Sequence, residues 1–444
     1  MKKVLNLLPA LALIGLIALI YLYFYPGFMS FDSMTQYQSA LAGEFADNHP
    51  AIMSWIWHFL MLIVPGPQGM LYFHLLLLFT AVLLWQHNLS GFWPKFLLPF
   101  MFIAPWIINF AGVLWKDVGM AYSLLSATAL LYNREKSIKL ACCAIPFILY
   151  ACAVRYNAIL AIVPLIFIFF LFHYSKLPFW KSSFFTIALS VVCFLTIPAV
   201  TYGLIHAEKR HYETLLMGDE IAKISAETQQ NIMPWIKHED LLSCTQPPIL
   251  YERALCFIHR GYDESGSLVT KLPVEEVHKL WEQTVLNHPM AYLNVRIEAF
   301  LYFLRSPSLE PVYFWFPGIM ENSLGIKLKH PERADDLGKY VTSSTQTIIV
   351  SEFFKPYLWL LLALALVALA FLLENRVARM QIIALNLSSL GCFSSLFIAV
   401  PSTDFRYIYW CVVATSLSLF VFISAWLHSR LSVENRDDVS TIKK

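Results

Sequence analysis

Four short segments, far apart in the chain, combine charged side chains with aromatic ones. They contain Asp32, the run Trp115-Lys116-Asp117, the run Arg155-Tyr156-Asn157, and the run Asp404-Phe405-Arg406-Tyr407. A carboxylate at a partly dry interface has a raised pKa unless it is paired, and it then suits a general base. Arg and Lys are the side chains that bind phosphate. Together these residue types predict acid–base chemistry on a phosphorylated substrate.

Each segment also has a simpler interpretation. Asp32 or Ser30 would serve as the N-cap of the helix that follows, and the pair at 116–117 would snorkel from a membrane to its surface. Arg155 would be held by a structural ion pair to one of the carboxylates, and 401–410 fits an aromatic belt with an embedded charge pair. The residue types alone leave both interpretations open.

The composition shows what kind of protein positions these segments. Of 444 residues, 58% are hydrophobic and only 14% are charged, whereas a soluble globular chain carries about 25% charged residues. This excludes an ordinary soluble domain. A net charge of +2 without a basic stripe also speaks against a nucleic-acid partner. Membrane lipids are the expected surroundings.

Ten apolar runs approach the length of about 20 residues that a bilayer-spanning helix needs. We expect an all-α polytopic membrane protein whose spans lie at 4–25, 70–87, 95–112, 116–132, 138–154, 157–173, 183–204, 355–373, 378–398 and 405–427. The first run follows Met1-Lys2-Lys3. It is too long for the apolar region of a typical signal peptide and lacks a small-x-small cleavage site, so we interpret it as a retained anchor.

The distribution of Lys and Arg over the short loops predicts the orientation. Alternate loops carry most of the cations, namely Lys95, Arg134, Lys136, Lys139, Lys176, Lys181, Arg376, Arg379 and Arg430. With these loops inside, both termini face the cytoplasm, and we expect a multi-pass protein of the cytoplasmic (inner) membrane. The four segments with charged and aromatic residues then all lie on the outer face.

Two long segments are also expected outside. The first outer loop, 26–69, contains a polar helical pattern at 30–45 and an apolar stretch at 51–64, which suits interfacial helices. The second, 206–354, reads as a mostly helical soluble outer domain. The expected layout is a transmembrane module at 1–205, the outer domain, further transmembrane helices at 355–427, and a cytoplasmic tail at 428–444.

The eight cysteines include two in a polar stretch, Cys244 and Cys256. The other six lie in apolar runs, where a thiol usually acts as a small hydrophobic group. In an oxidising compartment the two polar-stretch cysteines are candidates for a disulfide. There is no Cys-x-x-Cys metal spacing.

An acidic residue just after the first span, a long first outer loop, and the segment Asp47-Asn48-His49-Pro50 resemble the GT-C integral-membrane glycosyltransferases. This superfamily includes the protein O-mannosyltransferases and the lipid A aminoarabinose transferases, and the resemblance is clearest over 20–175. Gly218-Asp219-Glu220-Ile221, the run 287–289 with Tyr292 and Arg296, and the run 404–407 resemble bacterial members of the same superfamily.

The resemblance implies a GT-C-like fold and transfer of a sugar from a polyprenyl-phosphate donor, with inversion, at the outer face. By position it implies that Asp32 is the general base, with Asp117 and His49 as further catalytic residues. The implied substrate-binding residues are Lys116, Arg155, Asn157, Asp47, Asp404, Arg406 and Tyr407. The acceptor would be a lipid, a glycan or a protein.

Two departures from the family pattern limit what is carried over. The early motif is a single Asp-Ser instead of a pair of acidic residues, so no cofactor is firmly expected and the use of a divalent metal stays open but is disfavoured. The Trp-Trp-Asp signature of oligosaccharyltransferases is absent. Two alternatives stay open. One is a polysaccharide polymerase or ligase that uses a diphosphate-linked donor, and the other is a non-enzymatic lipid or glycan transporter. Transporters usually place polar residues at mid-membrane, whereas these lie at helix ends.

Overall fold

The structure is a computed structural model, which describes residues 7–234, 272–305, 307–400 and 402–441. This part of the chain consists of helices and their connections, with three isolated β-bridges and no strand. The predicted all-α class is therefore confirmed for the described residues. Cys244 and Cys256 lie outside them.

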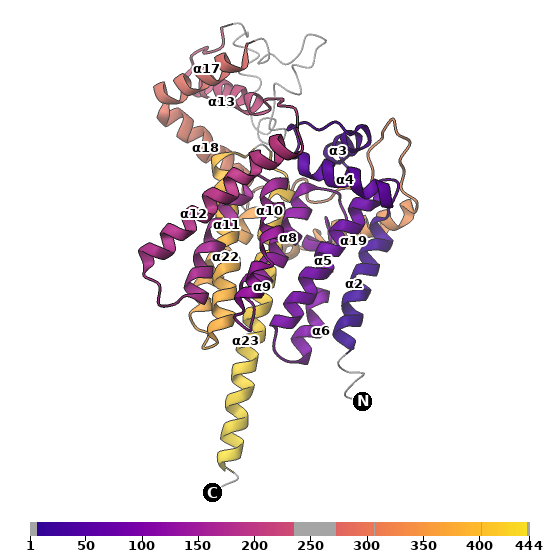
Figure 1. Ribbon diagram of the computed structural model, residues 1–444, viewed down its shortest axis with the longest axis vertical. Coiled ribbons are helices and arrows are strands. Elements are labelled where there is room, and N and C mark those ends of the chain that lie inside the picture. The colour runs from indigo at the N-terminus through magenta and orange to yellow at the C-terminus, as the bar shows by residue number, and fades with distance from the viewer. Residues whose placement is uncertain (1–6, 235–271, 306, 401, 442–444) are drawn as a thin grey trace.

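Most long helices run side by side along the molecule, as Figure 1 shows. They are α2 (Leu8–Phe24), α5 (Gln68–Asn88), α8 (Lys116–Leu131), α10 (Ile145–Val154), α11 (Ala158–His173), α12 (Phe179–Pro198), α21 (Pro356–Ala370), α22 (Arg376–Ile398) and α23 (Tyr409–Thr441). The start of α2 and the end of α23 lie at the same end of this bundle.

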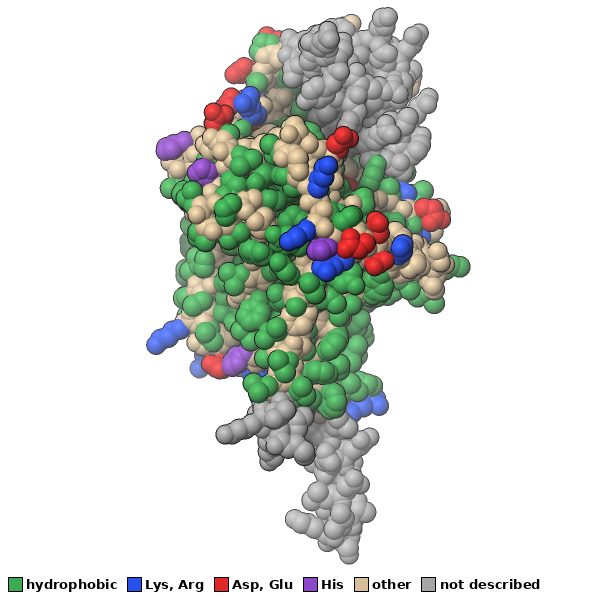
Figure 2. Space-filling view, turned by 90° about the vertical axis from the view of Figure 1, so that its right-hand side faces the viewer, with side chains coloured by type: hydrophobic (Ala, Val, Ile, Leu, Met, Phe, Trp, Pro, Cys, Tyr) green, Lys and Arg blue, Asp and Glu red, His purple; other side chains and the backbone are tan. Residues whose placement is uncertain are grey.

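Four helical segments are long and apolar enough to cross a membrane: Gln68–Asn88, Phe179–Leu204, Arg376–Ile398 and Phe405–Arg430. Shorter apolar helices accompany them, and Figure 2 shows a broad hydrophobic band between charged side chains above and below it. These features are those of an α-helical membrane protein. The number of ten spans and the direction of the termini stay predictions.

Two of the expected spans are not single helices, and prolines explain where they break. The run at 95–112 forms α6 (Phe92–Met101) and the short α7 (Pro105–Ile108). The run at 138–154 forms α9 (Ile138–Cys142) and α10, which has Pro146 in its first turn. Because proline lacks an N–H and its ring clashes with the preceding turn, it favours a helix start over a helix interior.

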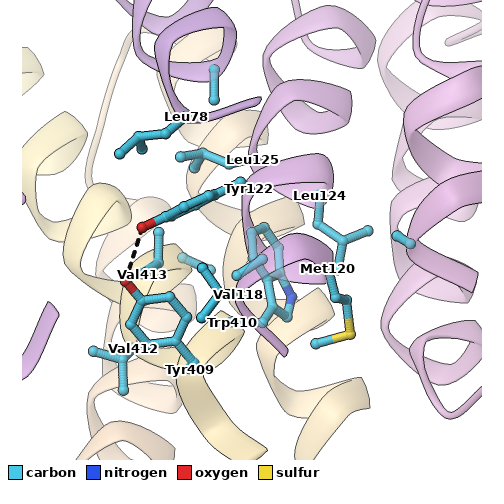
Figure 3. Close-up of a cluster of buried hydrophobic side chains, with 14 of the residues drawn as sticks. Leu78, Val118, Met120, Tyr122, Leu124, Leu125, Tyr409, Trp410, Val412 and Val413 are labelled. Carbon is cyan, nitrogen blue, oxygen red and sulfur yellow. Dashed lines mark hydrogen bonds between the residues drawn. The ribbon is translucent and has the colours of Figure 1, made fainter. Parts of the chain in front are cut away.

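Helix α8 forms the centre of the bundle, since every residue from Asp117 to Leu131 is buried. Figure 3 shows its side chains packed against those of α23, where the hydroxyls of Tyr122 and Tyr409 lie 3.3 Å apart. A charged residue at the start of such a helix has little access to water. Asp117, which is fully buried, therefore needs a charged partner within the protein.

A glycine allows α11 and α22 to pack closely. A Cβ atom at Gly391 of α22 would lie 2.1 Å from the carbonyl oxygen of Leu160 in α11. No side chain fits there unless the two helices separate. Helix α11 begins just after Arg155 and α22 ends six residues before Asp404, so this contact fixes the distance between two elements next to the site described below.

The segment 26–69 forms two helices, as the sequence predicts. They are α3 (Phe31–Ala42), which ends at Gly43 with φ of 70°, and α4 (Ala51–Ile63). Glycine adopts this left-handed conformation at no steric cost. The two helices pack on each other at one end of the bundle, where Figure 1 shows them. The orientation of α4 along a membrane surface stays a prediction.

The segment 206–354 contributes two groups of helices. The first group is α13 (Glu213–Thr228), α17 (Val274–Asn287) and α18 (Pro289–Phe303), which lie together beyond the same end of the bundle as α3 and α4. The second is α19 (Pro331–Ser344) and the short α20 (Ile348–Glu352). Helix α19 packs against α2 and α7, so this part of the segment returns to the bundle.

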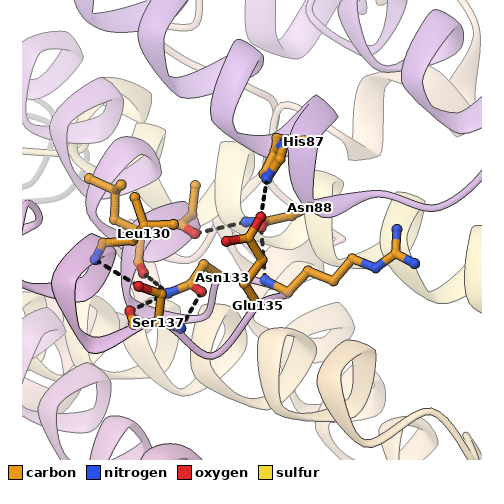
Figure 4. Close-up of polar contacts among 9 residues, drawn as sticks. His87, Asn88, Leu130, Asn133, Glu135 and Ser137 are labelled. Atoms are coloured by element: carbon orange, nitrogen blue, oxygen red, sulfur yellow. Dashed lines mark hydrogen bonds and ion pairs between the residues drawn. The ribbon is translucent and has the colours of Figure 1, made fainter.

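The opposite end of the bundle is closed by polar contacts, shown in Figure 4. The side chain of Asn88 donates to the carbonyl of Ala129 and accepts from the backbone N–H of Arg134. The carboxylate of Glu135 lies 3.1 Å from His87. These contacts tie the end of α5 to the turn after α8, far from the residues that the sequence singles out for chemistry.

Candidate functional site

Backbone pairing brings the starts of α3 and α8 together. The N–H of Phe28 donates to Gly112, and the N–H of Leu114 donates back to Phe28, at 3.1 and 2.9 Å. On the other side, Met29 exchanges hydrogen bonds with the segment 318–320. Asp32 and Lys116 follow these pairings by a few residues. These backbone hydrogen bonds therefore fix the positions from which the side chains of Asp32 and Lys116 extend.

Arg406 is the centre of one group of charges. It lies in the 3-10 helix η2 (Phe405–Ile408), and its Nη1 is 3.0 Å from Oδ2 of Asp32. Its Nε is 3.1 Å from Oδ2 of Asp404. The guanidinium also covers the ring of Trp115, 4.5 Å from the centroid. Three elements from distant parts of the chain meet at this arginine.

A second ion pair lies beside the first. Nη2 of Arg155, at the end of α10, is 3.0 Å from Oδ1 of Asp117, whose side chain is 0% exposed. The guanidinium of Arg155 lies 5.0 Å from the ring centroid of Tyr407, and that of Arg406 lies 5.3 Å from the same ring. Tyr407 therefore joins both pairs into one site.

Lys116 and His49 complete this group. Lys116 acts electrostatically on Asp32, Asp117 and both arginines, and His49 acts on Asp32. Within the described part of the chain, the ammonium of Lys116 has neither a hydrogen-bond nor an ion-pair partner. We call the eight residues the charged cluster: Asp32, His49, Lys116, Asp117, Arg155, Asp404, Arg406 and Tyr407.

The environment of the charged cluster sets which groups are ionised. Burial opposes the ionisation of Asp32, but Arg406, Lys116 and His49 outweigh it and lower its pKa to about 2. Burial and the nearby Lys116 lower the pKa of His49 to about 4, against the opposing effect of Asp32. Burial raises the pKa of Asp404, although Arg406 opposes it. At neutral pH Asp32 is charged and His49 is neutral.

The interpretation of Asp32 as a helix cap is wrong. The cap position of α3 belongs to Ser30, which makes no capping hydrogen bond through its side chain. Its Oγ instead accepts from the indole N–H of Trp115, at 2.7 Å. The carboxylate of Asp32 instead faces Arg406. This pairing lowers the pKa of Asp32, whereas the pKa of an unpaired carboxylate at an interface would be raised.

Two predicted substrate-binding residues lie outside the charged cluster. The carboxylate of Asp47 accepts hydrogen bonds from the Tyr202 hydroxyl at 2.8 Å and from the backbone N–H of Arg210 at 2.7 Å. The side-chain amide of Asn157 donates to Oγ of Ser395 in α22, at 2.9 Å. Both side chains hold neighbouring elements in place.

The later motif residues form a separate buried network in the outer segment. Arg296 of α18 lies 3.0 Å from Glu220 of α13, and it also donates to the carbonyl of Ile398 at 2.7 Å. The indole of Trp281 donates to the other oxygen of Glu220. Ile398 is the last residue of α22, and Asp404 follows six residues later. The network thus anchors the chain just before the charged cluster.

Gln36 is a residue to which sequence reasoning assigned no role. It lies one helical turn after Asp32 in α3, and its Nε2 is buried without a hydrogen-bond partner in the described structure. A buried amide without a partner is costly. The spacing of four residues from Asp32, which places both on one helix face, is the signal that would have found it.

An apolar groove lies between α21 and α23. Its volume is about 300 Å³, and its lining includes Trp106, Phe353 and Trp359 with side chains of α21 and α23. The ring of Phe354, next to Phe353, contacts that of Phe405, 5.9 Å away. Aromatic side chains therefore connect the groove with the residue that precedes Arg406.

The arrangement offers an anionic group two arginines and a lysine, beside an ionised carboxylate. Such a site can bind a phosphate and accept a proton next to it. Among the described residues, no group of three or more His, Cys, Asp or Glu side chains is placed to hold a metal ion. No known protein family and no curated protein sequence matches this chain.

Proposed function

We propose that the protein transfers a sugar from a polyprenyl-phosphate donor to an acceptor at the outer face of the cytoplasmic membrane. One observation carries the proposal. Asp32, Lys116, Arg155 and Arg406, which come from distant parts of the chain, meet in one charged cluster at the end of an apolar helical bundle. The GT-C resemblance assigns the same residues to base and phosphate-binding roles.

The cations of the cluster would hold the donor phosphate. Arg155 and Arg406 are each paired with carboxylates inside the protein, whereas Lys116 has no partner among the described residues. A phosphate that contacts Lys116 and Arg406 adds charge-assisted hydrogen bonds and replaces those that Arg406 makes to Asp32. The same contacts stabilise the phosphate as it leaves the sugar.

Donor binding would also activate the base. While Asp32 is paired, its pKa of about 2 leaves it ionised but weakly basic. When a phosphate engages Arg406, the carboxylate loses its main electrostatic partner and its pKa rises. Asp32 becomes a stronger base only when the donor is present.

In the reaction, an acceptor hydroxyl attacks the anomeric carbon of the donor sugar. The bond between that carbon and the phosphate oxygen breaks, and the polyprenyl phosphate leaves with the electron pair. Asp32 takes the hydroxyl proton. Attack opposite to the leaving phosphate inverts the configuration, and the charges balance without a redox partner.

The groove beside Phe353 and Trp359 suits the hydrocarbon part of this donor. It is lined mostly by apolar side chains, and several of them come from α21 and α23. A prenyl chain that lies there would follow α23, which directly continues the 3-10 helix of Arg406, toward the charged cluster. Burial of each additional CH₂ group contributes about 0.8 kcal/mol to binding.

A diphosphate-linked donor is the second candidate, because three cations in one cluster suit its greater charge. This would make the protein a polysaccharide polymerase or ligase. The leaving group distinguishes the two reactions, since one releases polyprenyl monophosphate and the other releases the diphosphate.

The test uses the full chain in proteoliposomes with polyprenyl-monophosphate and polyprenyl-diphosphate sugars and a cell-envelope extract as acceptor. We expect release of polyprenyl monophosphate, loss of release in Asp32→Asn, and normal release in Lys339→Ala, which changes an exposed residue of α19. Release of the diphosphate alone selects the second candidate. Full activity of Asp32→Asn contradicts the role of Asp32 as the base.

A further inference from the structure

A second cavity lies further along α3. It has a volume of about 500 Å³ and opens between the C-terminal half of α3, the segment 44–48 and the segment 208–215. Its polar lining comprises Gln38, Ser39, Glu44, Asn48, Glu208 and Arg210. We call it the outer pocket. None of the residues of the charged cluster lines it.

The walls of the outer pocket are held by backbone hydrogen bonds. The N–H of Asp47 donates to Glu208 at 3.0 Å, and the N–H of Glu208 donates to Phe45 at 2.8 Å. The carboxylate of Asp47 adds hydrogen bonds from the backbone of Arg210 and from Tyr202. Two segments about 160 residues apart are thereby fixed on each other, and the cavity between them is preformed.

The chemistry of the lining differs from that of the charged cluster. Its one arginine, Arg210, is already paired with Glu208 at 2.6 Å, and Glu44 adds a second carboxylate. An anionic ligand would be repelled there. A ligand rich in hydroxyl groups suits it, because a hydroxyl donates to carboxylates and accepts from amides such as those of Gln38 and Asn48.

Two rings add an apolar component to the lining. Phe45 and Tyr212 both border the outer pocket. The C–H faces of a sugar ring are apolar, whereas its rim carries hydroxyls, so a cavity with both rings and hydrogen-bonding groups fits a carbohydrate. A wholly apolar ligand would leave the carboxylates without partners, which costs free energy.

One face of α3 connects the outer pocket with Asp32. Residues 32, 36 and 39 follow each other on this face, and the rise of 1.5 Å per residue places Ser39 about 10 Å along the axis from Asp32. Between them lies Gln36, whose buried Nε2 has no partner in the described structure. Asn48 of the pocket also directly precedes His49 of the charged cluster.

From these observations we infer that the outer pocket binds the carbohydrate portion of the acceptor, an uncharged glycan. The inference rests on the proposed transferase function and names the substrate class that it uses. A glycan seated there would extend one to two sugar units along α3 to bring its terminal hydroxyl to Asp32.

The experiment measures glycan binding by the full chain in lipid nanodiscs, without any donor. The probes are chitotetraose, cellotetraose and maltotetraose, observed by saturation-transfer NMR. We expect at least one to bind, and Glu44→Ala to weaken it about tenfold through the loss of a charged hydrogen-bond acceptor. Ser39→Trp, which fills the cavity, should abolish binding. Lys339→Ala, an exposed residue of α19, should bind as the wild type does.

Each outcome bears on the pocket separately from the transfer reaction. If no tetrasaccharide binds, or if binding survives both Ser39→Trp and Glu44→Ala, the pocket is not a glycan site. If binding depends on the pocket but no transfer is found with any donor, the glycan site stands and the proposed function fails.

Discussion

Replacing Asp32 by asparagine tests the ion pair at the centre of the charged cluster. The substitution removes the negative charge and keeps the shape of the side chain, and an amide oxygen still accepts a hydrogen bond from Arg406. Arg406 also keeps its contact with Asp404. The variant therefore isolates the charge of Asp32 from its packing.

The size of the effect follows from the pKa of Asp32. Arg406, Lys116 and His49 lower it from the ordinary value of 3.8 to about 2, although burial opposes them. This difference corresponds to roughly 2 kcal/mol of stability. Because the pKa is lower in the folded protein, the contribution is complete above pH 3.8 and is lost as the pH falls through 2.

The assay compares the free energies of unfolding of the wild type and Asp32→Asn in detergent micelles across this pH range. We expect the variant to be less stable by about 2 kcal/mol at pH 7, with the gap closing between pH 4 and pH 2. Asp336→Asn is the control, because its partner Lys339 is 77% exposed and lies 3.5 Å away. Such a surface pair contributes about 0–1 kcal/mol.

Two results would refute the reasoning. Equal stability of Asp32→Asn and the wild type at pH 7 would mean that the pairing with Arg406 contributes nothing. A gap that stays constant down to pH 2 would mean that the loss comes from packing and not from the charge.

Three further substitutions test other parts of the structure. Asp117→Asn leaves the largely buried Arg155 without its carboxylate partner, which lies 3.0 Å away. We expect the free energy of unfolding, measured by denaturant titration, to fall by about 3–5 kcal/mol. A loss as small as the roughly 0–1 kcal/mol of an exposed ion pair would contradict this expectation. Gly391→Ala forces α22 away from Leu160, and we expect it to destabilise the protein by about 1–3 kcal/mol. The unfolding temperature should fall, and an unchanged unfolding temperature would argue against this helix contact. Arg296→Met removes the hydrogen bond that holds the end of α22. We expect weaker donor binding, measured as a raised KM for the donor. An unchanged KM would contradict this expectation.

Hydropathy predicted most helices of the bundle, because a span in lipid must be both apolar and helical. It missed the breaks in the runs at 95–112 and 138–154. Hydropathy averages over a window, whereas a proline acts at one position: Pro105 opens α7, and Pro146 lies in the first turn of α10. The two prolines do not lower the average hydropathy of either run enough to divide it, so each run is predicted as one span.

The charged cluster was foreseen as a set of residues, but its pairings were not. Loop charges placed Asp32, Arg155 and Arg406 on one face, yet charge alone does not say that Arg406 pairs with Asp32 while Arg155 pairs with Asp117. That choice depends on contacts between elements hundreds of residues apart. For the same reason Asp47, expected to contact substrate, instead ties two loop segments together.

The outer pocket had no signal in the sequence. Its walls come from two segments whose pairing rests on backbone hydrogen bonds, such as that between Asp47 and Glu208. Backbone groups are the same in every residue, so their pairing is set by the fold as a whole. A cavity built in this way is found only when the fold is known.

The central claim is that the charged cluster binds a lipid phosphate, and direct binding of polyprenyl phosphate tests it most simply. The measurement uses native mass spectrometry of the full chain with polyprenyl phosphate, for the wild type, Lys116→Met and the exposed control Lys339→Ala. We predict that the wild type and the control bind equally, and that Lys116→Met binds about tenfold more weakly. Equal binding by Lys116→Met and the wild type would contradict the proposed role of the charged cluster.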